Sequence, residues 1–411
     1  MPTTSAYVLV FVVALGTTFA VTPLFRRLAW RYGVVAPVTD RAVHAKPVPY
    51  LGGAAMFVGL LAALLVAWLT RGFPSVFDDS SSTLIGVAVG SVVLCGLGTL
   101  DDIRDVSAPA KTAGVVLAGS VMYLLGVGLL YFRVPIVDGL IVVPSDWAPL
   151  ITVLWVLGMA NAVNLIDGLD GLAAGIVAIA AGSFFLYGHK LATAPLLVIP
   201  PSNPSTLIAV ITTGICLGFL PHNFNPAKIF MGDGGSLMLG GLMAAATVLV
   251  GGQTSEPASG QVFFFFAPLF IPFFVMGVPI IDTAFAIIRR ARKRASMSEA
   301  DKDHLHHRLM RLGHGHRRSV VILWLWTGLL SVFVLYPVYT GKGDAVVPVA
   351  VGALGLILLT FFHPGTRRDR RRTEPDADAG TSGDPGADPG GGLDDGLDGD
   401  GAASPVDAGT T

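Results

Sequence analysis

The chain is organised as a series of long apolar runs separated by short polar connections. A run of about 17–25 mostly apolar residues is long enough to cross a bilayer as a helix. The pattern predicts about eleven such helices, and it therefore indicates an all-α polytopic membrane protein. The expected spans are 5–25, 51–70, 83–100, 112–132, 148–165, 172–188, 205–220, 236–251, 262–288, 319–339 and 345–362.

The ninth of these runs is expected to form a broken helix. It contains Pro268, Pro272 and Pro279, and proline inside a helix removes a hydrogen bond and kinks the chain. Asp282 lies in the same run, and we favour a structural pairing with a nearby cation over a chemical role. The first run has no basic residue before it and no clear cleavage site after it, so we expect a span rather than a removed signal peptide.

The composition agrees with a membrane protein. Hydrophobic residues make up 53% of the 411 residues and charged residues only 13%, and the mean hydropathy is +0.67. Soluble domains carry roughly 25% charged residues, so a soluble enzyme, a disordered scaffold and a nucleic-acid-binding domain are all disfavoured. Cys95 and Cys216 lie in apolar runs. We interpret them as small buried hydrophobes and not as a disulfide framework.

The basic residues predict the orientation in the membrane. Alternate connections and the start of the C-terminal tail hold 23 Lys and Arg residues, and the other connections hold only four. Basic connections stay in the cytoplasm. The C-terminus is therefore expected in the cytoplasm, and with eleven spans the N-terminus is expected outside.

The last part of the chain differs in composition from the rest. It opens on a cluster of arginines from Arg367 to Arg372 and continues as an acidic segment rich in Gly, Asp, Ala and Pro. Such a segment cannot bury enough apolar surface to fold. We predict a membrane domain over residues 1–365 and a disordered cytoplasmic tail over residues 366–411.

Polar residues gather in five clusters, all on the side of the basic connections. Ionisable groups at membrane level are costly and are functional candidates by default. Because five separate connections can converge, we expect one site on this side. The first cluster is Asp40–Pro49, followed by Gly52 and Gly53. Its Lys46 could bind a phosphate as a point charge, and ordinary positive-inside charge is the alternative.

The second cluster, Asp101-Asp102-Ile103-Arg104-Asp105, holds three carboxylates at the end of a span. Mutually repelling carboxylates usually need a cation, and Mg²⁺ prefers one or two carboxylates together with substrate phosphates. A solvated helix end is the alternative reading. Lys111 follows shortly afterwards and opens the next span.

The third and fourth clusters also combine polar side chains with glycine. Residues 161–171 carry Asn161, Asn164, Asp167 and Asp170 at intervals of three, which places them along one helix stripe. The alternative is a polar seam between packed helices. In residues 223–236, a Gly-rich turn precedes a span, and a helix N-terminus suits phosphate or metal. This segment includes Asn223, Phe230 and Asp233.

The fifth cluster is His304-Leu305-His306-His307-Arg308 in the largest basic connection. No cysteine accompanies the histidines, which weakens a zinc site. The neighbouring basic residues favour an anion instead. Carboxylates for Mg²⁺, basic loops for anions and a nearby aromatic together suit a nucleotide diphosphate, and a membrane site suits a lipid partner. The sequence thus predicts phosphoryl transfer, in which positioning and charge stabilisation supply most of the catalysis.

The five motifs together resemble the polyprenyl-phosphate N-acetylhexosamine-1-phosphate transferase family, in the same order and over roughly residues 5–362. The histidine motif HLHHR and the DDxxD ending at Asp105 are similar to the branch that transfers N-acetylglucosamine (GlcNAc) 1-phosphate from UDP-GlcNAc. The resemblance implies a bacterial plasma-membrane enzyme that makes polyprenyl-diphosphate-GlcNAc and UMP for a lipopolysaccharide, arabinogalactan or teichoic acid. It allows a homodimer and implies no nucleic-acid partner.

The resemblance also implies residue roles. Asp233 and Asp102 would be the Mg²⁺ ligands, with Mn²⁺ as a substitute, and Asp101 would activate the lipid phosphate. Asn164, Asp167 and Asp170 would line the nucleotide pocket. Further expected substrate contacts are Lys46, Lys111, Asn223, Phe230, His304, His306, His307 and Arg308. We favour direct attack over an aspartyl-phosphate intermediate.

Three alternative functions would each leave a different pattern in the sequence. The peptidoglycan branch uses UDP-MurNAc-pentapeptide, and it typically carries three consecutive histidines and ten spans. A secondary transporter for an anion would distribute charges on both sides of the membrane, whereas here they crowd on one. A non-catalytic membrane scaffold would not keep every motif intact.

Overall fold

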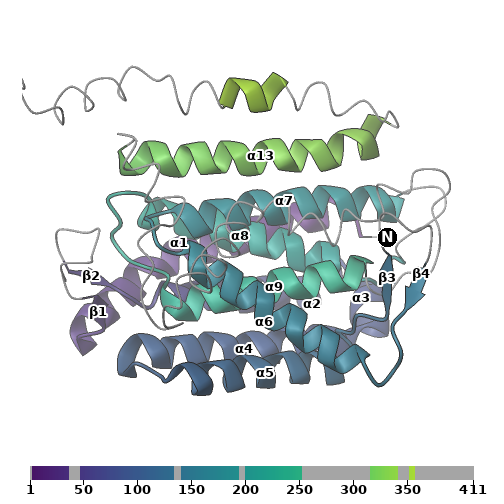
Figure 1. The fold of residues 1–411 in the computed structure, drawn as a ribbon, viewed down its shortest axis with the longest axis horizontal. Coiled ribbons are helices and arrows are strands. Elements are labelled where there is room, and N and C mark those ends of the chain that lie inside the picture. The colour runs from purple at the N-terminus through teal and green to yellow at the C-terminus, as the bar shows by residue number, and fades with distance from the viewer. Residues whose placement is uncertain are drawn as a thin grey trace, which may run out of the picture. The chain divides into compact units, whose positions relative to one another are not determined.

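The computed structural model describes residues 2–36, 47–133, 140–193, 200–251, 315–340 and 351–356. These residues form a bundle of long helices (Figure 1), which confirms the predicted all-α polytopic class. Within the described ranges, eight helices are long and apolar enough to span a membrane. They are α1 (Thr4–Tyr32), α2 (Gly52–Leu69), α4 (Ser81–Arg104), α6 (Ala148–Ile166), α7 (Leu172–Thr193), α8 (Ser205–Asn223), α9 (Gly232–Gly251) and α13 (His316–Thr340).

The predicted span 112–132 is wrong in its second half. Helix α5 (Ala108–Leu124) ends early, and Gly126 follows it with a φ of 107°. The apolar residues beyond continue into strand β3 (Tyr131–Arg133), which pairs antiparallel with β4 (Leu140–Val142). Hydropathy does not distinguish an apolar strand from a helix, whereas a glycine in a left-handed conformation ends one.

The remaining short elements are β1 (Val35–Ala36), β2 (Val48–Pro49) and α3 (Pro74–Asp79). Strands β1 and β2 pair antiparallel. The predicted span 262–288, with Asp282, lies outside the described residues, and so does the predicted tail 366–411. Of the predicted span 345–362, only residues 351–356 are described, and they are helical.

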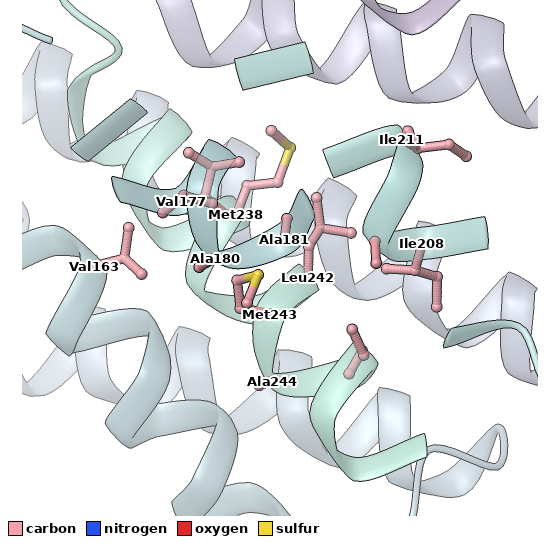
Figure 2. Packing of buried hydrophobic residues seen from close by; sticks show 14 of the residues in the cluster. Val163, Val177, Ala180, Ala181, Ile208, Ile211, Met238, Leu242, Met243 and Ala244 are labelled. Atoms are coloured by element: carbon pink, nitrogen blue, oxygen red, sulfur yellow. The ribbon is translucent and has the colours of Figure 1, made fainter. Parts of the chain in front are cut away.

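Helix α9 lies at the centre of the bundle. In its most apolar stretch 94% of the residues are buried, against 22% for α1, and it packs against α4, α6, α2 and α8. Figure 2 shows Met238, Leu242 and Met243 of α9 among buried side chains of α6, α7 and α8, including Val163 and Ile208.

Small residues set how closely these helices approach. A Cβ at Gly240 would lie 2.5 Å from the Ala160 backbone, and one at Gly98 would overlap the Asp233 backbone. In lipid, helices associate through this kind of close backbone packing, because apolar burial gives little preference for protein over lipid. The glycines therefore decide which helices become neighbours of α9.

The chain direction brings the polar motifs to one end of the bundle. Helices α4 and α6 finish there, and α2, α5 and α9 begin there. Backbone hydrogen bonds from Gly52 N to Phe230 O (3.0 Å) and from Gly53 N to Met231 O (2.9 Å) tie the start of α2 to the turn before α9. Motifs distant in sequence thus meet at the same membrane level.

Candidate active site

Lys111 links three helices at this end of the bundle. It lies in the first turn of α5, and its ammonium donates a hydrogen bond to Asp101 Oδ2 of α4 at 2.9 Å. The same ammonium forms an ion pair with Asp233 Oδ2 at the start of α9. All three side chains are partly exposed, at 16–27%. The second and fourth sequence clusters therefore meet around one cation that a ligand can reach.

Asp102 contacts the start of α9 through its carboxylate. Its Oδ1 accepts the backbone N–H of Asp233 at 2.9 Å, and its Oδ2 accepts that of Gly234 at 3.4 Å. The first N–H groups of a helix have no partner within the helix, so Asp102 caps α9 from another helix. Gly232, with a φ of 66°, makes the approach feasible, since a Cβ there would collide with the Asp102 carboxylate.

Asn164 joins α6 to the same cluster. Its Nδ2 donates to Asp233 Oδ1 at 2.7 Å and to Ser236 Oγ at 2.9 Å. Asp233 is thus held from both sides, by Asn164 on one oxygen and by Lys111 on the other. Ser236 is the last residue of the fourth cluster, and the sequence pattern predicted no role for it. Its position three residues after Asp233 on a helix is the signal that could have found it.

Asp167 lies just beyond the end of α6, beside the other acidic groups. Burial raises the pKa of its carboxyl well above the usual range, and the charges of Asp233, Asp102 and Asp170 raise that pKa further. A strongly perturbed carboxyl next to other acidic groups is typical of functional sites.

Asp170 holds the loop that leads into α9. Its Oδ2 accepts hydrogen bonds from Asn225 Nδ2 at 2.8 Å and from Ala227 N at 3.0 Å. Arg317, near the start of α13, donates from Nε to Asn225 O at 2.8 Å. Asp170 therefore positions the loop before α9. Its predicted contact with a nucleotide stays a prediction. Arg317 carried no sequence signal that separated it from its basic neighbours.

Asn223 is buried at 2% exposure and uses both ends of its amide inside the protein. Its Oδ1 accepts from Gly171 N at 2.9 Å, and its Nδ2 donates to Ile229 O at 3.0 Å. The side chain therefore joins the third and fourth clusters. Its predicted substrate contact is untested and stays a prediction.

Phe230 is fixed through its backbone. Its N–H donates to Pro49 O at 2.9 Å, and its ring lies 5.9 Å from the ring of Tyr50. Tyr50 was not singled out from sequence. Lys46, His304, His306, His307 and Arg308 lie outside the described residues. The first cluster is therefore described only in part, and the fifth lies wholly outside the described ranges.

The donor set fits a divalent cation that is shared with a substrate. Among the described residues, Lys111 is the cation that pairs with Asp101 and Asp233, and Asp102 makes no ion pair, so the formal charge of these four side chains is negative. Across the described ranges, no three Asp, Glu, His or Cys side chains form a metal-binding group by themselves. Mg²⁺ commonly binds through one or two carboxylates and completes its ligands with phosphate oxygens and water.

The described helices thus form a multi-pass membrane bundle with acidic, amide and basic side chains gathered at one end. The sequence model of glycosyl transferase family 4 matches residues 84–251. The chain belongs to this family, and it is a phosphoglycosyl transferase.

The chain is similar to curated proteins over most of its length. It is 38% identical over 375 residues to the decaprenyl-phosphate N-acetylglucosaminephosphotransferase of Mycobacterium tuberculosis, covering 89% of this chain and 90% of that protein. It is 37% identical over 327 residues to the probable undecaprenyl-phosphate N-acetylglucosaminyl 1-phosphate transferase of Bacillus subtilis, covering 79% and 83%. It is also 32% identical to a phospho-N-acetylmuramoyl-pentapeptide-transferase of Desulforudis audaxviator, covering 78% and 96%.

Proposed function

We propose that this protein transfers GlcNAc-1-phosphate from UDP-GlcNAc to a polyprenyl phosphate with Mg²⁺ as cofactor. The products are polyprenyl-diphosphate-GlcNAc and UMP, and the reaction is the first membrane step of a cell-envelope polysaccharide. The observation that carries the proposal is the convergence of Asp101, Lys111, Asn164 and Asp233 from four helices. The names of the mycobacterial and Bacillus relatives support the sugar.

In the proposed reaction, an oxygen of the lipid phosphate attacks the phosphorus that bears the sugar. The bond from that phosphorus to the UMP oxygen breaks, and UMP leaves with the electron pair. The Lys111 ammonium lies where it can offset the charge of the phosphates, and Asn164 fixes the orientation of the Asp233 carboxylate. Asp101 lies beside Lys111, in a position to orient the attacking phosphate.

Asp233, with Asp102 beside it, would hold Mg²⁺, which supplies neutralisation of phosphate charge when bound. Positioning of this kind is the main contribution that a protein makes to phosphoryl transfer. Direct attack needs no covalent enzyme intermediate and so remains our preferred route. We further propose that the site faces the cytoplasm, because the flanking connections hold most of the basic residues.

The direct test is UMP release by the purified full-length protein with undecaprenyl phosphate and Mg²⁺. UDP-GlcNAc and UDP-MurNAc-pentapeptide are offered in parallel. We expect UMP and a lipid-linked sugar from UDP-GlcNAc alone. Turnover of the pentapeptide donor instead would support the peptidoglycan alternative, to which the relative at 32% identity belongs.

The variant that tests the site is Asp233→Asn, which keeps the side-chain shape and removes the charge. It is expected to abolish turnover while the protein still folds. Asp146→Asn is the matched control, because Asp146 is an exposed carboxylate just before α6, at the other end of that helix. Retained activity in Asp233→Asn would remove Asp233 from the catalytic role.

A further inference from the structure

A cavity of about 430 Å³ lies at the far end of α2 from the active site. It is lined by Trp68, Leu69, Arg71, Pro74, Phe77 and Asp78. Helix α2 begins at Gly52 beside the turn before Asp233, and its 18 residues rise about 27 Å along the helix axis. Figure 1 accordingly places α3 and the β1–β2 pair toward opposite ends of the bundle. The cavity is therefore separate from the catalytic cluster.

Two opposite charges in this cavity are available to a ligand. Arg71 and Asp78 are both exposed. Neither side chain makes an ion pair or hydrogen bond with another residue in the described part of the chain. A guanidinium binds phosphate well because its donors match the spacing of two phosphate oxygens, and a carboxylate accepts hydrogen bonds from an ammonium group.

The surface beside the cavity is apolar and follows one face of α2. Leu61, Leu65 and Trp68 are exposed at 42%, 54% and 57%, and their spacing of four and three residues places them on the same helix face. Trp68 is at the end of the span, where tryptophan commonly marks the membrane–water interface. An acyl chain lying along this face would bring its headgroup to Arg71.

We propose that this cavity binds the headgroup of a zwitterionic aminophospholipid of the phosphatidylethanolamine type. Arg71 holds the phosphate, Asp78 accepts hydrogen bonds from the primary ammonium, and one acyl chain lies along Leu61 and Leu65. The separate charges of Arg71 and Asp78 determine which lipid headgroup binds. A purely anionic headgroup would meet the Asp78 carboxylate without a cation to offer it, and a choline headgroup has no N–H to donate.

Arg71 offers a clean variant. Its φ is 49°, a left-handed conformation that glycine adopts more readily than arginine. Arg71→Gly therefore removes the guanidinium and relieves the backbone at the same position, so the fold should be retained. Asp78→Asn removes the carboxylate charge. Arg31→Gln is the control. Arg31 lies in the last turn of α1, just before β1, and therefore at the active-site end of the bundle and away from the cavity.

The experiment measures lipid binding to the delipidated, detergent-solubilised full-length protein by native mass spectrometry, with thermal unfolding in parallel. Phosphatidylethanolamine, phosphatidylcholine and phosphatidylglycerol of matched chains are compared. We expect the unmodified protein to bind phosphatidylethanolamine preferentially and to be stabilised by it. Arg71→Gly should bind phosphatidylethanolamine about tenfold more weakly. Asp78→Asn should lose the preference over phosphatidylcholine, and Arg31→Gln should behave as the unmodified protein does.

Equal binding of all three lipids by the unmodified protein would overturn the proposal. So would unchanged phosphatidylethanolamine binding by a folded Arg71→Gly variant, or a stronger response to phosphatidylglycerol. The readout does not use UMP release, so it stands or falls separately from the transferase proposal.

Discussion

The carboxylate of Asp102 caps the helix that carries Asp233. Asp102 Oδ1 accepts the Asp233 backbone N–H at 2.9 Å, although 131 positions separate the two residues in the chain. Caps usually come from the residue just before the helix. Here α4 supplies the cap for α9, so the arrangement of the acidic residues and the packing of the two helices depend on each other.

This cap predicts different effects for two substitutions of Asp102. Asp102→Ala leaves two backbone N–H groups at the start of α9 without an acceptor, and should lower the free energy of unfolding by about 1–3 kcal/mol. Asp102→Asn keeps one acceptor oxygen and should lose less. Thermal unfolding in detergent without added metal measures both. Both substitutions remove the same charge and only Asp102→Asn keeps an acceptor, so equal stability of the two variants would contradict the cap.

Two glycines on α4 provide a matched pair. A Cβ at Gly98 would overlap the backbone at Asp233, whereas one at Gly96 meets no atom within 4 Å. Gly98→Ala should push α9 away from α4, costing about 1–3 kcal/mol of stability as overpacking does and most of the transferase activity. Gly96→Ala should change stability by no more than about 1 kcal/mol and retain activity. Equal behaviour of the two variants in unfolding and UMP-release assays would contradict the packing.

Because the pKa of the Asp167 carboxyl is raised, its ionised form is predicted to destabilise the folded protein in a pH-dependent way. Its folded-state pKa lies above the unfolded value, so the folded protein disfavours the ionised carboxyl. The resulting cost is absent below the unfolded pKa of about 3.9 and grows as the pH rises toward the folded pKa. Asp167→Asn removes the charge, so it should raise the midpoint of thermal unfolding at pH 7.5 and have little effect near pH 4. The measurement is made with EDTA present, and the opposite pH trend would refute it.

Lys111 is expected to compete with a divalent cation for the carboxylates. Its ammonium contacts both Asp101 and Asp233, so Lys111→Gln removes positive charge from an acidic cluster. This variant should bind Mn²⁺ more tightly, measured by electron paramagnetic resonance, and yet lose most turnover because the substrate phosphates lose a cation. Weaker Mn²⁺ binding in a folded Lys111→Gln protein would argue against a shared site.

Asp170 gives a test of positioning against direct substrate contact. Its Oδ2 accepts from Asn225 and Ala227, and the amide oxygen of asparagine can accept the same two hydrogen bonds. Asp170→Asn should therefore retain much of the activity, whereas Asp170→Ala should raise KM for the nucleotide sugar by loosening the loop before α9. Equal loss in both variants would instead indicate that a substrate needs the Asp170 charge. Initial rates over a range of UDP-GlcNAc concentrations separate the two cases.

The sequence predicted the fold class, and several of the polar residues that it singled out lie in contact in the structure. The apolar runs predicted the membrane helices because span length follows from bilayer thickness alone. Prediction was wrong where an apolar segment turned into strand β3, because hydropathy carries no information on the backbone conformation at Gly126. It also gave no role to Ser236, Tyr50 or Arg317, whose contacts come from other helices and loops.

What the sequence determined by itself is local: which segments are apolar enough for lipid, and which polar residues stand at their ends. Only the tertiary structure decided that Asp102 caps α9, that Lys111 joins Asp101 to Asp233, and that Asn223 faces the protein interior. The physical reason is that glycines allow only certain helices to approach each other closely, and these helices become neighbours in the bundle. A hydrogen bond across 131 positions exists only after that choice is made.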